Sequence, residues 1–208
     1  RMFPVYSDVS LTLIIILSLV WFLPVLFFRY YKIWILYFIT GVGGFTVLGA
    51  FILNESWFEN FLSATAVGIC ARMADYLSLQ VQAFADAGIM LISSPAFSGF
   101  TSMSIDIECS GMLEMLVVWA LIIFFPIFDR GERVWYLFWG SIMVYLVNLV
   151  RILVILLALS YWGRDSIFIV HTVIARGIFF ILIVMIFWEI FTRKSIECIR
   201  KLHSGGDE

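Results

Sequence analysis

Long apolar stretches dominate this sequence, and they direct most of the chain into a lipid bilayer. A membrane-spanning helix needs about 20 mainly apolar residues. Of the 208 residues, 63% are hydrophobic and 13% are charged, and the mean hydropathy is +1.05. Soluble domains are about 45–50% apolar and about 25% charged, so the composition excludes a water-soluble enzyme, a disordered chain and a nucleic-acid-binding protein. We expect five spans, at about residues 9–28, 33–53, 111–128, 135–157 and 167–191.

Residues 54–108 differ from the rest of the chain because they carry six acidic residues and a single base, Arg72. Within them, residues 61–84 predict an amphipathic helix that lies at the membrane interface, since Arg72 and Asp75 interrupt its apolar pattern. Residues 89–107 show apolar residues alternating with polar ones beyond a turn-rich segment, which is typical of a β-hairpin. Unpaired strand edges are not stable in lipid, so this hairpin is expected on an aqueous face.

Together these patterns predict an all-α polytopic membrane protein with one membrane-embedded domain over residues 1–208. It contains about five transmembrane helices, the amphipathic helix and the small β-hairpin. Lysine and arginine favour the cytoplasmic side, and eight bases fall on one side of the predicted topology against three on the other. The amino terminus, the segment 54–108 and the loop 160–165 are therefore expected outside, and the tail 192–208 inside. The eight bases are Arg29, Lys32, Arg130, Arg133, Arg193, Lys194, Arg200 and Lys201, and the three are Arg1, Arg72 and Arg164.

Polar residues inside predicted spans are costly and are candidates for function. Cys109 precedes the third span, Arg151 lies near the outer end of the fourth, and His171 lies about one turn into the fifth. The topology thus places a thiol, a guanidinium and an imidazole from three helices at one depth. Further polar residues share these spans, namely Glu114 on the third, Asn148 on the fourth and Arg176 on the fifth.

This set suits acyl transfer through a thioester. A thiol at a helix amino terminus beside cationic groups has a lowered pKa and becomes a nucleophile. His171 can shuttle protons, and Arg151 can stabilise an oxyanion in a dry site. Other readings stay open: a cysteine that only packs, as we interpret Cys70 and Cys198, an interfacial histidine, an arginine that snorkels to the headgroups, or a polar path in a transporter or proton-relay subunit.

Glu114 and Arg176 are expected to form a buried supporting ion pair. Glu114 lies five residues beyond Cys109, and Arg176 lies five residues beyond His171. Both therefore sit roughly 7.5 Å deeper than those neighbours, and on an ideal helix each is turned about 140° away from them. A contact between Arg176 and a substrate is the alternative.

Three sequence blocks also resemble the exosortase/archaeosortase family of membrane cysteine transpeptidases, closest to its short Gram-positive form. They are Asp106–Gly111 (DIECSG), Asn148–Ile152 (NLVRI) and His171–Arg176 (HTVIAR). The resemblance implies that Cys109 is the nucleophile and that Arg151 and His171 are essential. The polar residues near them in the sequence are expected to support them, namely Glu108, Glu114, Asn148 and Arg176.

The same resemblance implies a reaction and a location. The enzyme would cleave a membrane-anchored protein near a C-terminal sorting signal and pass the new carboxyl end to a lipid or surface acceptor. It would be a multi-pass protein of the plasma membrane with its active site on the extracytoplasmic side. No cofactor or metal is expected, because the dispersed cysteines lack metal-ligand spacing.

Overall fold

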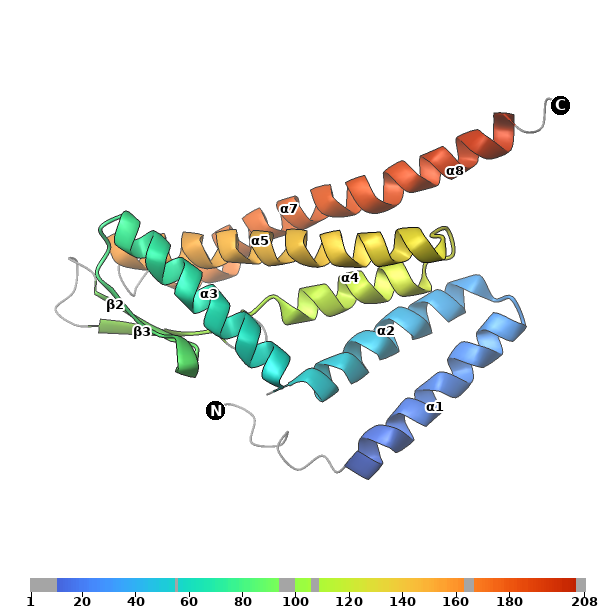
Figure 1. Ribbon diagram of the computed structural model, residues 1–208, viewed down its shortest axis with the longest axis horizontal. Coiled ribbons are helices and arrows are strands. Elements are labelled where there is room, and N and C mark those ends of the chain that lie inside the picture. The colour runs from blue at the N-terminus through green and yellow to red at the C-terminus, as the bar shows by residue number, and fades with distance from the viewer. Residues whose placement is uncertain (1–10, 55, 94–99, 106–108, 163–166, 205–208) are drawn as a thin grey trace.

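The computed structural model describes residues 11–54, 56–93, 100–105, 109–162 and 167–204. Its first two helices, α1 (Leu11–Tyr30) and α2 (Trp34–Leu53), form an antiparallel hairpin close to the expected bounds (Figure 1). Trp21 Nε1 donates a hydrogen bond of 2.7 Å to the carbonyl of Thr40. A Cβ at Gly44 would lie 1.8 Å from Trp21 Nε1, so the glycine allows the two helices to pack closely.

Helix α3 (Trp57–Tyr76) begins at an N-cap, where the Ser56 hydroxyl accepts a hydrogen bond from the amide of Glu59. The expected helix 61–84 is wrong at its carboxyl end. The chain leaves the helix because Ser78 has a φ of 58° and the amide of Leu79 returns to the carbonyl of Ala74, a helix-terminating arrangement. One face of α3 is buried and packs in the core with α5 and the sheet.

The segment that follows α3 is a three-stranded antiparallel sheet with the order β1-β2-β3. Strands β2 (Ile89–Ser93) and β3 (Phe100–Ser104) form the predicted hairpin, while β1 (Val81–Phe84) replaces the expected end of the helix. A short 3-10 helix, η1 (Ala85–Ala87), joins β1 to β2. Alternate residues of β2 and β3, such as Met90, Ile92 and Met103, are buried in the core, so one face of the sheet packs on the helices.

Helix α4 (Met112–Phe124) has 13 residues and is about 20 Å long, shorter than a hydrocarbon core of about 30 Å. It covers only part of the expected span 111–128. Helix α5 (Arg130–Trp162) has 33 residues and extends beyond the expected span 135–157 at both ends. The charged residues 130–133, which lie between the expected spans 111–128 and 135–157, form the start of α5, because arginine and glutamate are good helix formers.

The last helical segment runs continuously from Ile167 to Ser204, so the predicted polar tail is helical over most of its length. It comprises α6 (Ile167–Ile169), a π-helical turn η3 (Val170–Ala175), α7 (Arg176–Phe187), a second π-helical turn η4 (Trp188–Thr192) and α8 (Arg193–Ser204). An ion pair between Lys194 and Glu132 ties α8 to the start of α5.

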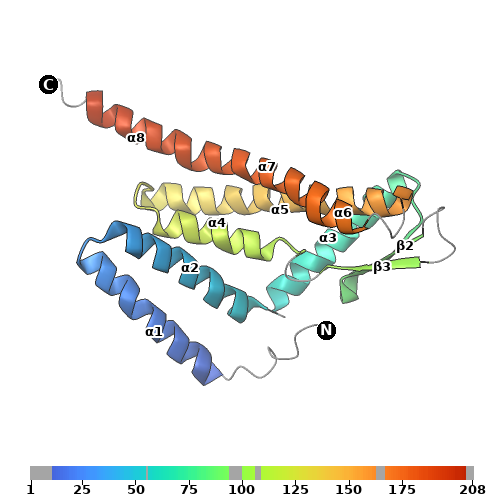
Figure 2. The ribbon, with the colours of Figure 1, turned by 180° about the vertical axis from the view of Figure 1, so that it is seen from behind.

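The molecule has two ends that differ in structure (Figures 1 and 2). The sheet, α3 and α6 lie at one end, and the α1–α2 turn, the α4–α5 turn and α8 lie at the other. All the basic segments predicted to be cytoplasmic are therefore at the end opposite the sheet. Within the part of the chain that the structure describes, four helices are long and apolar enough to cross a membrane, over Thr12–Tyr30, Trp34–Leu53, Arg130–Trp162 and Val170–Ile196. The chain is a membrane protein.

Candidate functional site

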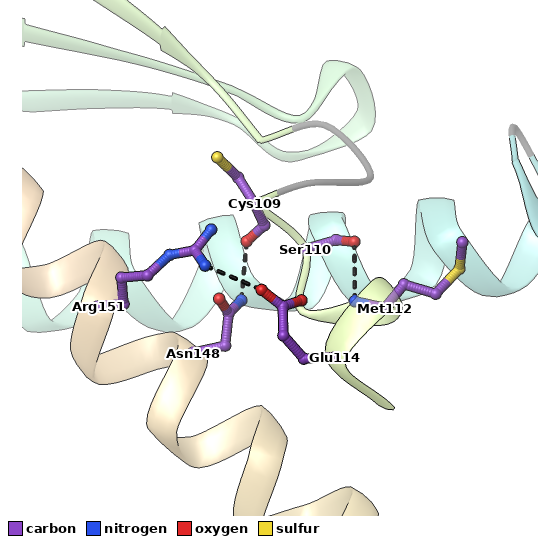
Figure 3. Close-up of polar contacts among 6 residues, drawn as sticks. All are labelled: Cys109, Ser110, Met112, Glu114, Asn148 and Arg151. Atoms are coloured by element: carbon purple, nitrogen blue, oxygen red, sulfur yellow. Dashed lines mark hydrogen bonds and ion pairs between the residues drawn. The ribbon is translucent and has the colours of Figure 1, made fainter. Parts of the chain in front are cut away.

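Cys109 lies on the short connection between the sheet and α4, at the sheet end of the molecule (Figure 3). Gly111, the N-cap of α4, has a φ of 82°, a left-handed conformation that favours glycine. The buried Ser110 accepts a hydrogen bond from the amide of Met112. This tight turn starts α4 directly after Cys109. Glu108, the expected supporting residue beside it, lies outside the described residues.

Asn148 anchors the Cys109 connection to α5. Its side chain is completely buried, and its Nδ2 donates a hydrogen bond of 2.8 Å to the carbonyl oxygen of Cys109. A Cβ at Gly111 would come within 3.0 Å of the Asn148 side chain, so the glycine is needed here for space as well as for its φ. Figure 3 shows the Cys109 side chain pointing away from Asn148 while its carbonyl faces the amide.

Arg151 lies one turn along α5 from Asn148. It forms an ion pair with Glu114, which the sequence predicts to pair with Arg176 instead. Arg151 Nη1 lies 3.0 Å from Glu114 Oε1, and the two side chains are 9% and 23% exposed. The guanidinium also lies 5.2 Å from the ring centroid of Phe179 on α7, a cation–π distance. The predicted Glu114–Arg176 pair is therefore wrong. Matching depth does not determine lateral position, and the face of α5 that carries Asn148 and Arg151 is turned towards the start of α4.

The π-helical turn η3 changes the relation between His171 and Arg176. On an ideal α-helix these residues, five apart, point about 140° from each other. In a π-helix the hydrogen bonds run from i to i+5, so residues five apart lie nearly one above the other. Both side chains line the same cavity, in keeping with this geometry.

A cavity of about 440 Å³ brings together most of the predicted residues. Cys109 enters it from the connection before α4, Arg151 from α5, and His171 and Arg176 from the last helical segment. Glu114 also lines it, while Asn148 is buried behind Cys109. The other described residues that line the cavity are apolar, namely Leu113, Phe179 and Phe180.

Phe179 is a residue of the cavity lining that the sequence pattern does not single out. It contacts the guanidinium of Arg151 and comes from an apolar stretch in which every residue suits a membrane span. Its position three residues after Arg176, and so on the same side of the helix, is the only sequence signal that could have singled it out.

The two cysteines whose side chains the structure describes, Cys70 and Cys109, have different surroundings. Cys70 on α3 is completely buried in the core, and this burial raises the pKa of its thiol to about 12. It therefore stays protonated and unreactive at neutral pH, in keeping with a packing role. Cys109 is partly exposed and faces the cavity, so it is the thiol that a substrate can reach.

Within the described parts of the chain, no three His, Cys, Asp or Glu residues are grouped so that they could hold a metal ion. No protein-family model, curated protein or solved structure matches the chain.

Proposed function

We propose that this protein is a membrane cysteine protease and transpeptidase of the exosortase/archaeosortase type. The observation that supports it most is the common cavity of Cys109, Arg151 and His171, which are far apart in the sequence and come from the connection before α4, from α5 and from η3. A nucleophile, a proton carrier and a fixed cation around one space that can hold a substrate are the groups that acyl transfer needs.

The first half of the reaction forms a thioester. The Cys109 thiolate, at the amino-terminal end of α4 and beside two guanidinium groups, attacks the carbonyl carbon of the scissile peptide bond. The carbon–nitrogen bond breaks, and His171 delivers to the leaving amine the proton that it took from the thiol. In the second half, an acceptor hydroxyl, amine or water attacks the thioester and gives its proton to His171. The carbon–sulfur bond then breaks, and the thiolate is regenerated.

Arg151 is suited to stabilise the oxyanion that forms in both steps. Its guanidinium is held by Glu114 on one side and by the ring of Phe179 on the other, so little reorganisation is needed when charge develops. Neither step as written uses a metal or a cofactor. Glu114 acts through Arg151 and is a positioning residue.

The proposed substrate is a membrane-anchored protein with a C-terminal sorting signal, and the acceptor is a lipid or a surface molecule. We place the enzyme in the plasma membrane with the sheet and Cys109 on the extracytoplasmic side. This orientation is supported by the basic turns and tail, which lie at the end opposite the sheet (Figure 1).

The surroundings of the cavity favour acyl transfer over a path for protons or solutes. The core that continues from the cavity towards the basic end is apolar and is built from α4, α5 and α7, including Met115, Val118, Ile122, Val144 and Ile183. A relay would need polar groups there, whereas a nucleophilic site needs them only at the reacting end.

Replacement of Cys109 in cells tests the proposal. Cys109→Ala should abolish processing of the surface proteins that the wild-type chain cleaves, detected as new carboxyl ends by mass spectrometry of membrane and secreted fractions. Cys70→Ala is the matched control and should leave processing unchanged, since Cys70 is buried away from the cavity. Processing that persists in Cys109→Ala, with the protein still present, would contradict the proposal.

A further inference from the structure

Arg176 differs from Arg151 in having no acidic partner among the residues that the structure describes. Both guanidinium-bearing residues line the cavity, but Arg151 is buried against Glu114, whereas Arg176 is exposed. The described lining of the cavity thus holds two arginines and one carboxylate, so the described residues do not compensate the charge of Arg176.

The position of Arg176 makes this charge costly without a ligand. It is the seventh residue of the apolar span Val170–Ile196, about 9 Å from the start of that span. Arginine at such a depth usually pairs with an anion or faces a polar cavity. The π-helical turn η3 directs Arg176 into the cavity beside His171, and π-helical turns are frequent at functional sites.

We propose that Arg176 forms an anion-binding subsite next to Cys109, which binds a ligand carrying a carboxylate or a phosphate on an apolar body. The guanidinium can make two parallel hydrogen bonds to either group. Leu113, Phe179 and Phe180 supply apolar walls around it, which suit the rest of such a ligand. The subsite concerns binding alone and does not depend on catalysis by Cys109.

The reactivity of Cys109 with charged thiol reagents tests the charge of this subsite. In purified Cys198→Ser protein in a neutral detergent, Cys109 is modified by a methanethiosulfonate that carries either a sulfonate or a trimethylammonium group, and the two rates are compared. Arg176 should favour the sulfonate. Arg176→Gln should lower the sulfonate-to-ammonium rate ratio by roughly three- to tenfold, as expected for one charge at close range, and Arg176→Lys should keep most of it.

Arg72→Gln is the matched control because Arg72 is exposed on α3 and does not line the cavity. Its rate ratio should equal that of the parent protein. An unchanged ratio in Arg176→Gln, or an equal fall in Arg72→Gln, would overturn the proposal. If Arg176→Gln does not fold, the ligand experiment below tests the subsite in the parent protein.

Small amphiphiles test the ligand class. Octanoate and octyl phosphate should slow the modification of Cys109 by an uncharged reagent, and octanol at the same concentration should not. The protection should disappear in Arg176→Gln and persist in Arg72→Gln. Equal protection by octanol would show that the anion is not recognised. Equal protection by inorganic phosphate would show that the apolar body is not recognised. Either result would contradict the proposed ligand.

Discussion

Arg151 on α5 and Glu114 on α4 form an ion pair of 3.0 Å in which the arginine is 9% exposed. The pair links the helix that follows Cys109 to the helix that carries Asn148, and it fixes the guanidinium at the wall of the cavity. Breaking such a pair from one side leaves an uncompensated charge in a poorly solvated place.

Glu114 and Arg151 should be coupled in stability. Glu114→Gln and Arg151→Gln should each destabilise the protein by about 3 kcal/mol, the cost of a buried charge left without its partner. The double variant should be milder than the sum by at least about 1 kcal/mol. Thermal unfolding in detergent, followed by circular dichroism, measures the four members of this cycle.

The same cycle with Arg176→Gln in place of Arg151→Gln is its control. Because no Glu114–Arg176 ion pair is present among the described residues, the effects of Glu114→Gln and Arg176→Gln on stability should be nearly additive. Coupling in this second cycle that matches or exceeds the first would show that Glu114 pairs with Arg176 instead.

The π-helical turn η3 should be required to hold His171 at the cavity. Insertion of one alanine after Thr172 adds a residue between His171 and Arg176 and should rotate His171 by about 100° relative to Arg176. Activity should fall by at least tenfold, because a catalytic group that is displaced from its position slows the reaction strongly. Cross-linking of Cys109 to cysteine at position 171 by a short bis-methanethiosulfonate should also be lost.

Insertion of one alanine after Thr192, at the end of the second π-helical turn, η4, is the matched control. It alters the register of α8 and not that of the residues lining the site cavity, so cross-linking between positions 109 and 171 should persist. If both insertions abolish the cross-link while the protein stays folded, the role assigned to η3 is wrong.

Gly111 should tolerate no side chain. Gly111→Ala places a Cβ within 3.0 Å of Asn148 and forces alanine into a φ of 82°, which should cost about 1–3 kcal/mol of stability and slow the alkylation of Cys109. Gly68→Ala on α3 is the comparison, because a Cβ there meets nothing within 4 Å. It should be neutral or stabilising, by up to about 1 kcal/mol. Equal effects of the two substitutions would argue against the tight contact of Gly111 with Asn148.

Cys70 should make stability depend on pH in the alkaline range. Its thiol pKa is raised from 9.0 to about 12 in the folded protein by burial, so the folded state keeps a proton that the unfolded state loses. The free energy of unfolding should therefore be unaffected below pH 9. It should fall between about pH 9 and 12, by as much as about 1.4 kcal/mol per pH unit. Cys70→Ala should lack this part of the slope, and an identical slope in both proteins would show that the thiol is not protected.

The sequence predicts those parts of the fold that depend on hydrophobic patterning. The first two spans agree with α1 and α2 to within a few residues, because long apolar runs have few alternatives in a membrane. The end of α3 could not be located, because residues 77–84 suit a helix by composition. The termination depends on the backbone of Ser78 and on pairing of β1 with β2, which forms only in the folded chain.

For the candidate site, the predicted topology and the position of each residue along its span indicate which residues share an end of the molecule. Cys109, Arg151 and His171 do line one cavity. Depth does not specify which neighbour a side chain faces. The sequence therefore predicts an ion pair of Glu114 with Arg176, whereas in the structure Glu114 pairs with Arg151. The orientation of Arg176 depends on a π-helical turn, which has no periodic signature in an apolar stretch such as residues 167–175.

The central claim is that Cys109 forms a thioester with a substrate, and capture of that intermediate tests it most directly. Membranes from cells that express the chain are quenched in acid, the protein is digested, and the peptide that contains Cys109 is analysed by mass spectrometry. The proposed function predicts an attached peptide with a new carboxyl end, released by neutral hydroxylamine and absent from Cys109→Ser digests under the same treatment. A Cys109 peptide that is always unmodified, in cells where processing continues in Cys109→Ala, would contradict it.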